Sequence, residues 1–177
     1  MNVLIQPVSG KIIAIDKTVS TLEQLGKEHR VLIQLVNAEV IFSSLHIHSA
    51  IEHAIRSFVQ GLAITSSLNL ELLLYIAGER QIHRALKKVG ITKQTTDFVI
   101  IIVDEINTIE GYDGKFSTNL LDLTLKITQL KKNNHMIQGN QNTLKKFGIT
   151  QKEINAIDPQ QYEGLILEKV AMVDVIK

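Results

Sequence analysis

The feature that most constrains this chain is an apolar run of six residues, Phe98–Val103, in which every residue after Phe98 is β-branched. The run is far shorter than the roughly 20 apolar residues that a membrane-spanning helix needs. Because β-branched side chains favour extended backbone and both faces of the run are apolar, residues 97–104 are predicted to form a buried strand. Val31–Val36 has a similar composition and is predicted to be a second buried strand.

Apolar residues at helical spacing predict several amphipathic helices around these strands. The strongest pattern spans 44–59, where Ile47, Ile51 and Ile55 share one apolar face. Residues 68–77 are apolar nearly all round, which is typical of a helix buried at the centre of a domain. The remaining predicted helices are 18–29, a basic helix from just after Gly78 to Gly90, 120–130, 150–156 and 159–172.

The rest of the chain is less regular. Val3–Ile5 and Lys11–Ile15 flank a proline-containing segment and predict either a strand pair or one interrupted edge strand. Residues 107–117 are predicted to be a loop, and 131–142 a loop or a disordered link. The last helix is expected to lead into a short strand at 173–176. At 177 residues the chain has the size of one domain, or of one domain with a small appendage.

The composition excludes several classes of protein and site. The chain has no cysteine, so disulfides, thiolate metal sites and cysteine nucleophiles are ruled out. Met1–Ile5 lacks the basic and long apolar segments of a signal peptide. No apolar run is long enough to cross a membrane. We therefore expect a cytoplasmic protein without a membrane partner.

Residues Ala77–Lys88 carry a local excess of positive charge. They hold Arg80, Arg84, Lys87 and Lys88 against one acid, a net charge of +3 in a chain whose total is +1. A basic surface on a nearly neutral protein indicates a phosphate-bearing partner at one place. The competing interpretation is a solvated helix surface, on which exposed charges are ordinary.

Helical spacing sharpens this pattern. Apolar residues form one stripe along 82–89, while Arg80, Arg84 and Lys88 follow one another at intervals of four. Like charges at this spacing repel each other by roughly a few tenths of a kcal/mol per pair, so either salt or an anionic partner must relieve them. The helix is predicted to begin after Gly78, where free N–H groups and an arginine would face a phosphate.

No catalytic arrangement can be recognised. The chain has neither a Gly-rich phosphate loop nor a nucleophile elbow. His46, His48 and His53 are spaced by two and five residues, which does not align them on a helix as metal ligands. Asp104 and Glu105 end a predicted strand, but adjacent side chains diverge, and a capped strand end is the favoured interpretation. We therefore expect a binding protein with no catalytic residues, metal or cofactor.

A short pattern, Leu-Lys-Lys-X-Gly-Ile-Thr, occurs twice, at Leu86–Thr92 and at Leu144–Thr150. Lysines near a helix C-terminus and a glycine just after it are typical of a helix stop. We therefore expect both glycines, Gly90 and Gly148, in the left-handed conformation, and we do not interpret the repeat as a duplicated domain.

Five segments resemble one known family in their residues and in their order along nearly the whole chain. They are Asn37–Val40, His53–Arg56, Leu70–Ile82, Ala85–Ile91 and Leu167–Asp174. The family is that of the small accessory subunit of the KEOPS complex, whose human counterpart is the kinase-binding protein of the p53-related protein kinase. Gly-Glu-Arg-Gln-Ile at 78–82 is the most specific part of the resemblance, and the compact chain resembles the archaeal type.

The resemblance implies an α/β fold, with a small mixed β-sheet packed with several helices in a single domain over 1–177. It also implies a non-catalytic subunit of the complex that makes the threonylcarbamoyl-adenosine (t6A) modification of tRNA. Such a subunit docks on the N-terminal lobe of the KEOPS atypical kinase subunit and meets the other KEOPS subunits indirectly. In archaeal members it also recruits tRNA through the 3′ CCA end.

Proteins bind RNA ends by stacking unpaired bases on arginine or aromatic planes and by placing basic side chains on phosphates. Together with the resemblance, this predicts RNA contacts from the basic segment: Arg80 and Gln81 at the terminal nucleotides, Ile82 as an apolar floor, His83 beside it, and Arg84 and Lys88 at phosphates. Core packing is the alternative for Ile82, and it is favoured over base stacking for Tyr75. Some archaeal relatives carry lysines just before the turn at 60–63, and this chain does not. Its RNA affinity is therefore expected to be lower or to depend on other residues.

The surface that would bind the kinase is expected to be an exposed apolar patch on paired helices. One candidate set is Ile51, Ile55, Phe58 and Val59, and the other is Leu165, Val170 and Met172. Two further functions stay open. The chain could be a pure protein-interaction module that activates the kinase without contacting RNA, or an enzyme with an unrecognised site.

Overall fold

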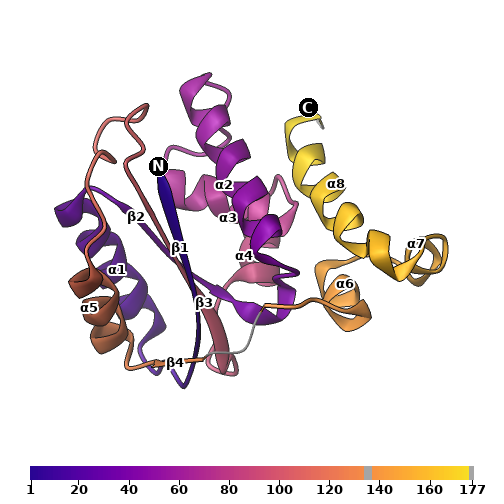
Figure 1. Ribbon diagram of the computed structural model, residues 1–177, viewed down its shortest axis with the longest axis horizontal. Coiled ribbons are helices and arrows are strands. Elements are labelled where there is room, and N and C mark those ends of the chain that lie inside the picture. Colours follow the sequence, from indigo (N-terminus) through magenta and orange to yellow (C-terminus); the bar gives the residue numbers. More distant parts are fainter. Residues whose placement is uncertain (134–136, 176–177) are drawn as a thin grey trace. The chain divides into compact units, whose positions relative to one another are not determined.

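A computed structural model describes residues 1–133 and 137–175 (Figure 1). The chain divides into two compact units, each built from two separate stretches of sequence. We call them the sheet unit, Met1–Asn37 with Ile91–Met136, and the helical unit, Ala38–Gly90 with Ile137–Lys177. The single domain over 1–177 implied by the resemblance stays a prediction.

The sheet unit takes its name from a four-stranded sheet in the order β2-β3-β1-β4. The strands are β1 (Asn2–Ser9), β2 (Leu32–Asn37), β3 (Asp97–Asp104) and β4 (Lys131–Lys132). Among the described residues, every pairing between them is antiparallel. The predicted α/β class is therefore confirmed, but the predicted mixed sheet is wrong.

The order of the strands explains why no parallel pair forms. β1 and β2 are joined by α1 (Ile15–His29) and run in the same direction, because both are antiparallel to β3. A crossover of this kind could place two parallel strands side by side. Here β3 lies between them, so the two parallel strands are never neighbours.

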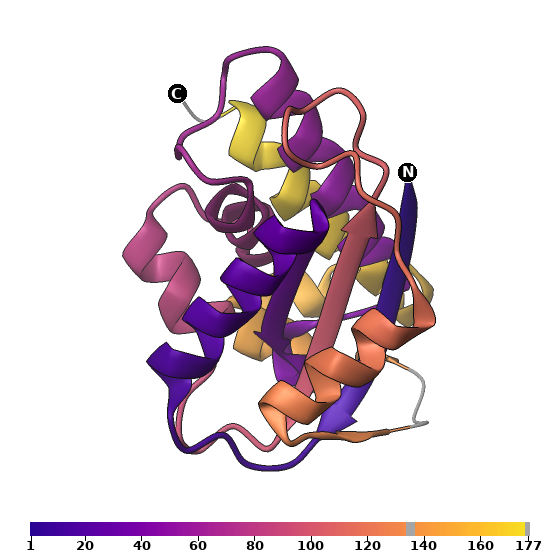
Figure 2. The same cartoon turned by 90° about the vertical axis from the view of Figure 1, so that its left-hand side faces the viewer.

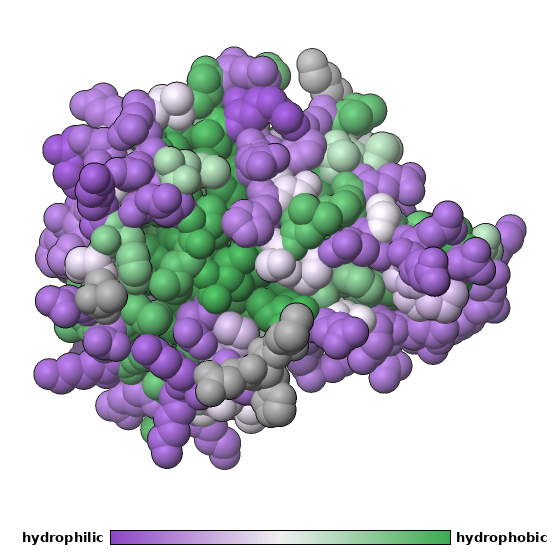
Figure 3. All heavy atoms as spheres, in the orientation of Figure 1, coloured by the Kyte–Doolittle hydropathy of each residue, from purple (hydrophilic) through white to green (hydrophobic). Residues whose placement is uncertain are grey.

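Two helices, α1 and α5 (Thr118–Thr128), cover one face of this sheet, as Figures 1 and 2 show. Alternate residues of β3 point to that face, where Phe98 and Ile100 join Leu22 and Leu25 of α1 in one buried cluster. Hydrophilic side chains cover the outward surface of α1, at the left of Figure 3. The amphipathic pattern of the sequence thus places the apolar side of α1 on the sheet and its polar side at the surface.

β1 is continuous and ends at Ser9, so both predicted alternatives, a strand pair at 3–5 and 11–15 or one interrupted edge strand, are wrong. Both backbone groups of a residue in an antiparallel strand point to the same side. The carbonyl oxygen of Pro7 accepts the N–H of Asn133 at 2.9 Å, on the side of β1 away from β3. The missing N–H of Pro7 therefore costs no hydrogen bond to β3. α1 begins at Ile15, three residues earlier than predicted.

As far as it is described, the helical unit consists of helices and two 3-10 turns. They are η1 (Ala38–Val40), α2 (Ser44–Val59), α3 (Leu68–Ala77), α4 (Ile82–Val89), α6 (Gln141–Phe147), α7 (Gln151–Asn155), η2 (Pro159–Gln161) and α8 (Tyr162–Val175). α3 packs against α2, α4 and α8, and Glu71–Ala77 is buried throughout, as predicted for a central helix. None of the described helices is long and apolar enough to cross a membrane.

Several predicted boundaries are confirmed and others are wrong. α2 and α3 have the predicted bounds, and Ser43 caps α2 by accepting the N–H of His46 at 3.1 Å. α4 ends before Gly90 as predicted, but it begins at Ile82 and not just after Gly78, so its predicted start is wrong. α8 continues through residue 175, so the predicted strand at 173–176 is wrong as far as it is described, and residue 176 lies outside the described residues. The predicted loop or link at 131–142 contains β4 and the start of α6, and its residues 134–136 lie outside the described residues.

Candidate ligand-binding site

Arg80 lies in the short connection between α3 and α4. Gly78 ends α3 with a left-handed backbone, φ 61°, and the N–H of Glu79 closes the last turn onto the carbonyl of Leu74 at 3.0 Å. A Cβ atom at residue 78 would lie 3.1 Å from both Lys169 and Phe147, so a side chain there would also be crowded. The sequence thus ends α3 abruptly, one residue before the acidic and basic pair Glu79 and Arg80.

Lys88 holds this connection in place. Its ammonium group lies 2.7 Å from the carboxylate of Glu79 and donates to the carbonyl of Ala77 at 2.9 Å. It also lies 4.6 Å from the centre of the Phe147 ring, in cation–π geometry. Ala77 is the last residue of α3, whose final carbonyls lack helical partners. Lys88 therefore caps α3 from α4, and its side chain is only 16% exposed.

A cavity of about 160 Å³ opens beside Arg80 within the helical unit. We call it the Arg80 cavity. It is lined by Arg56, Ser57, Gln60, Leu62, Ile64, Tyr75, Arg80, Val173 and Asp174. Two guanidinium groups and one carboxylate are among the lining side chains, and the apolar side chains offer walls for a planar group.

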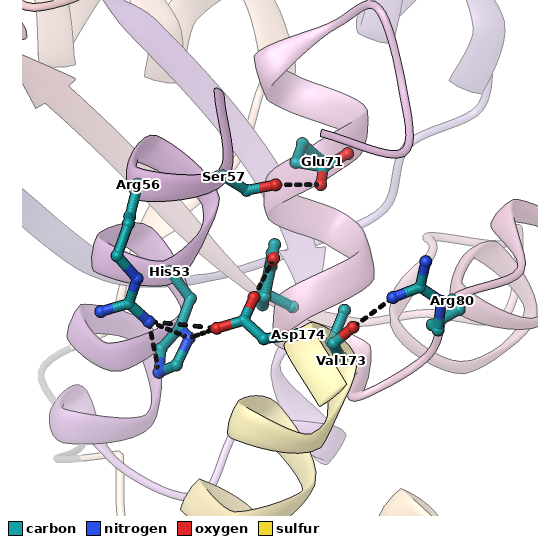
Figure 4. Close-up of polar contacts among 8 residues, drawn as sticks. His53, Arg56, Ser57, Glu71, Arg80, Val173 and Asp174 are labelled. Atoms are coloured by element: carbon teal, nitrogen blue, oxygen red, sulfur yellow. Dashed lines mark hydrogen bonds and ion pairs between the residues drawn. The ribbon is translucent and has the colours of Figure 1, made fainter. Parts of the chain in front are cut away.

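The last turn of α8 forms one wall of the cavity (Figure 4). Arg80 Nη1 donates to the carbonyl oxygen of Val173 at 2.5 Å. The adjacent Asp174 accepts the hydroxyl of Tyr75 at 2.5 Å and Arg56 Nη2 at 3.1 Å. His53 Nδ1 lies 2.6 Å from the same carboxylate. In Figure 4, the carboxylate of Asp174 points toward α2, between these partners.

Glu71 lies outside the lining but holds a loop that contributes to it. Its carboxylate is fully buried, and it accepts the N–H groups of Ile64 and Thr65 at 3.0 and 2.9 Å. The hydroxyls of Ser57 and Thr65 also donate to it, at 3.2 and 3.0 Å. A buried charge is tolerated when its hydrogen bonds are complete. Glu71 thereby fixes the loop between α2 and α3, which supplies Leu62 and Ile64 to the cavity.

The protonation states follow from these contacts. Burial raises the pKa of Tyr75 to about 12, and its hydrogen bond to Asp174 acts in the same direction. Burial alone would raise the pKa of Asp174, but hydrogen bonds from Tyr75, His53 and Arg56 together lower it below its usual value. Near neutral pH, Tyr75 is therefore a neutral donor and Asp174 an anion in contact with the guanidinium of Arg56.

The predicted RNA-binding residues separate into three groups. Arg80 lines the cavity, whereas Gln81, Ile82, His83 and Arg84 lie exposed on the adjoining turn. Lys88 is engaged within the protein, so a phosphate contact would require it to leave Glu79 and Ala77. Ile82 is 41% exposed, so core packing is wrong for this residue, while Tyr75 is 2% exposed and belongs to the core.

The two predicted kinase-binding sets also divide by exposure. On α2, Ile51 is buried at 2% exposure, whereas Ile55 and Phe58 are partly exposed and Val59 is 53% exposed. On α8, Val170 is fully buried, Leu165 is partly exposed and Met172 is 36% exposed. Buried Ile51 and Val170 have no surface to offer a partner, because their side chains pack inward along helices whose other faces are exposed.

Sequence reasoning did not assign Arg56 or Asp174 to a site. Both residues stand at the ends of segments that resemble the family, His53–Arg56 and Leu167–Asp174. His53 and Asp174 are 121 positions apart, and only the packing of α8 against α2 brings them together. The sequence signal that could have identified Arg56 and Asp174 was therefore a charged residue at the end of each of these two segments.

The other polar residues considered from the sequence have structural partners. His46 is buried, with Nε2 3.0 Å from the carbonyl oxygen of Ile76 and Nδ1 accepting the N–H of Phe42 at 3.3 Å. Asp104 accepts Asn2 and the N–H of Phe116, so the capped strand end is confirmed. Burial alone would raise the pKa of Asp104, but these hydrogen bonds lower it. Within the described ranges, potential metal ligands do not gather in groups of three or more.

The sequence model of one protein family, described as kinase binding protein CGI-121, matches residues 14–174. Because the match covers most of the sequence, the chain belongs to the CGI-121 kinase binding protein family. The family description names a binding role toward a kinase and no catalytic activity. Among curated proteins, no match to the chain is found.

Proposed function

We propose that this chain is a non-catalytic accessory subunit of a KEOPS complex and supports the t6A modification of tRNA. In this role it binds the N-terminal lobe of the complex's atypical kinase subunit and recruits tRNA through the 3′ CCA end. The kinase-binding description of its family supports the proposed binding to the kinase subunit. The KEOPS assignment rests on the resemblance of the five segments quoted above.

One observation carries the RNA part of the proposal: the guanidinium of Arg80 lines a cavity beside exposed basic residues. The 3′ end of a tRNA is single-stranded, so its bases are free to enter a small cavity and stack against an arginine plane. Arg80 uses one nitrogen for Val173, and arginine has further donors for a base or a phosphate. Arg56 provides a second guanidinium in the same lining.

The exposed turn beside the cavity supplies the remaining contacts in this proposal. Gln81 lies next to Arg80 and offers an amide, and the exposed Ile82 offers an apolar surface to a base. His83 and Arg84 are exposed at the start of α4, where Arg84 is free to meet a phosphate. Lys88 contributes mainly by holding the connection that carries Arg80.

For the kinase we propose the exposed part of α2, namely Ile55, Phe58 and Val59, with Ile51 supporting them from the core. The exposed apolar side chains of α8, Leu165 and Met172, are the alternative surface. α2 and α8 pack against each other within the helical unit, so both sets lie on paired helices. Apolar side chains exposed on paired helices are the usual form of such a docking surface.

Charge reversal separates this function from its alternative, a protein-interaction module that does not contact RNA. Arg84→Glu is the cleaner variant, because Arg84 is exposed, whereas Arg80→Glu also removes the hydrogen bond to Val173. We expect Arg84→Glu to weaken tRNA binding at least about tenfold, and Arg80→Glu more strongly, with kinase docking retained. Lys152→Glu on α7 makes the same charge change away from the cavity and serves as the control.

Binding of tRNA is measured at one fixed salt concentration, and docking is measured with the purified kinase subunit. Circular dichroism confirms that each variant is folded. If Arg84→Glu and Lys152→Glu bind tRNA equally well, the alternative function is favoured. If both arginine variants remain folded but fail to dock on the kinase, the separation of the two surfaces is wrong.

A further inference from the structure

The last turn of α8 joins the Arg80 cavity through two adjacent residues that act in different ways. Val173 contributes its backbone carbonyl, and Asp174 contributes its side chain. The final carbonyls of a helix have no partner within the helix, so the carbonyl of Val173 is free to accept an external donor. The negative end of the helix dipole also favours a guanidinium at this place.

Asp174 fixes where that carbonyl lies. Its carboxylate contacts α2 through His53 Nδ1 at 2.6 Å and Arg56 at 3.1 Å, and α3 through Tyr75 at 2.5 Å. These are charge-assisted contacts, which are stronger than contacts between neutral groups. The side chain of Asp174 is 34% exposed, so the contacts lie at the mouth of the cavity and not deep in the core.

We propose that Asp174 is a positioning residue for the ligand site. By fastening the last turn of α8 to α2 and α3, it holds the carbonyl of Val173 where that group orients the guanidinium of Arg80 along the cavity. It also holds Arg56 on the other side of the same space. This inference rests on the proposed function, in that the ligand is an RNA 3′ end bound at Arg80.

The direction in which one substitution changes the RNA affinity distinguishes a positioning role from a purely electrostatic one. A carboxylate in the lining of the cavity repels a phosphate, so its removal by itself should strengthen RNA binding. If Asp174 positions Arg80, its removal should weaken RNA binding instead, because the guanidinium loses its fixed direction. A residue that only stabilised the fold would change the melting temperature without opposing the electrostatic trend at temperatures where the protein is folded.

The experiment compares Asp174→Asn with Glu168→Gln. Glu168 is an exposed carboxylate on the same helix but outside the cavity, so both variants remove one negative charge from α8. The probe is a tRNA transcript that ends in CCA, titrated at one salt concentration. We expect Asp174→Asn to bind about tenfold more weakly than the wild-type protein, and Glu168→Gln to bind equally or slightly more tightly.

Two further variants protect the test against misfolding. His53→Ala removes one anchor of Asp174 from outside the cavity lining and should weaken binding in the same direction, by less. In an Arg80→Gln background, Asp174→Asn should no longer weaken binding, because the guanidinium that Asp174 orients is already absent.

The outcomes distinguish the inference from the function on which it rests. If the wild-type protein binds the transcript and Asp174→Asn binds at least as tightly as Glu168→Gln, the positioning role is wrong and the proposed function stands. If the wild-type protein does not bind the transcript at all, the proposed function fails, and the positioning role fails with it.

Discussion

At the scale of single residues, charged side chains hold the irregular segments of the helical unit through backbone groups. Glu71 accepts the N–H groups of Ile64 and Thr65, which orders the loop after α2. Lys88 donates to the carbonyl of Ala77 at the end of α3. Arg80 donates to the carbonyl of Val173 in the last turn of α8. Each group satisfies backbone atoms that helices and strands leave unpaired.

His46 makes the stability of the protein depend on pH. Burial lowers its pKa from 6.5 to about 4, the hydrogen bond to Ile76 acts in the opposite direction, and the nearby charge of Lys88 lowers the pKa further. The folded state therefore favours the neutral ring. Its contribution to stability is complete above pH 6.5 and is lost as the pH falls from 6.5 to 4, by on the order of 3 kcal/mol in total.

We predict that the free energy of unfolding falls over this pH range more steeply in the wild-type protein than in His46→Gln. Urea unfolding at several pH values between 7 and 4 measures both curves. Glutamine can still donate to the carbonyl of Ile76, but it does not take up a proton in this range. Parallel curves for the two proteins would show that His46 is not the titrating group.

At this scale, part of the site could be predicted from the sequence, because the residues that mark it are neighbours in the chain. Arg80 stands out because its charge and its neighbours are adjacent in the chain. The internal role of Lys88 and the contacts of Asp174 were not predictable, because their partners are brought together by packing. Lys88 meets Ala77 from the next helix, and Asp174 meets Tyr75 from 99 positions away.

At the scale of elements, the repeated Leu-Lys-Lys-X-Gly-Ile-Thr pattern ends two helices in different ways. Gly148 has φ 102°, the predicted left-handed conformation, whereas Gly90 has φ −65°, so the prediction for Gly90 is wrong. A Cβ atom at Gly90 would lie 2.2 Å from the carbonyl oxygen of Leu86. At Gly148 the nearest atom would be Lys88 Nζ at 3.8 Å, an ordinary contact. Gly148 is needed for its left-handed backbone, and Gly90 is needed because a side chain has no space there.

This difference predicts different responses to asparagine, which tolerates the left-handed conformation better than alanine does. At Gly148 we expect Asn to be less destabilising than Ala, by about 1 kcal/mol or less. At Gly90 we expect both to destabilise the protein by about 1–3 kcal/mol, because any Cβ meets Leu86. Chemical unfolding of the four variants gives the comparison. An asparagine that stabilises position 90 relative to alanine as much as position 148 would contradict this account.

Long periodic segments were predictable as elements because their pattern is contained in the segment itself. α2, α3 and β3 have the bounds that the sequence indicated. The order of the strands was not predictable in the same way, because β3 lies between β1 and β2 through long-range pairing. Pro7 also led to the prediction of an interrupted strand. The local sequence does not show which side of the strand the missing N–H of Pro7 faces.

At the scale of the whole molecule, the chain separates a sheet unit from a helical unit that carries every proposed functional residue. The Arg80 cavity, the exposed turn at 81–84 and the exposed side chains of α2 all belong to the helical unit. The family is described as kinase binding, and two guanidinium groups line the cavity. In the function we propose, this one unit holds both the kinase and the RNA end, at different surfaces.

The most direct test of this account is the binding of the protein to a tRNA transcript, compared with the same transcript trimmed of its CCA end. Both titrations are made at one moderate salt concentration, because phosphate contacts make the affinity depend on salt. We predict that trimming removes most of the binding, since the Arg80 cavity would lose the nucleotides that enter it. Equal binding of the two transcripts would contradict the account, because the protein would then recognise phosphate without recognising the 3′ end.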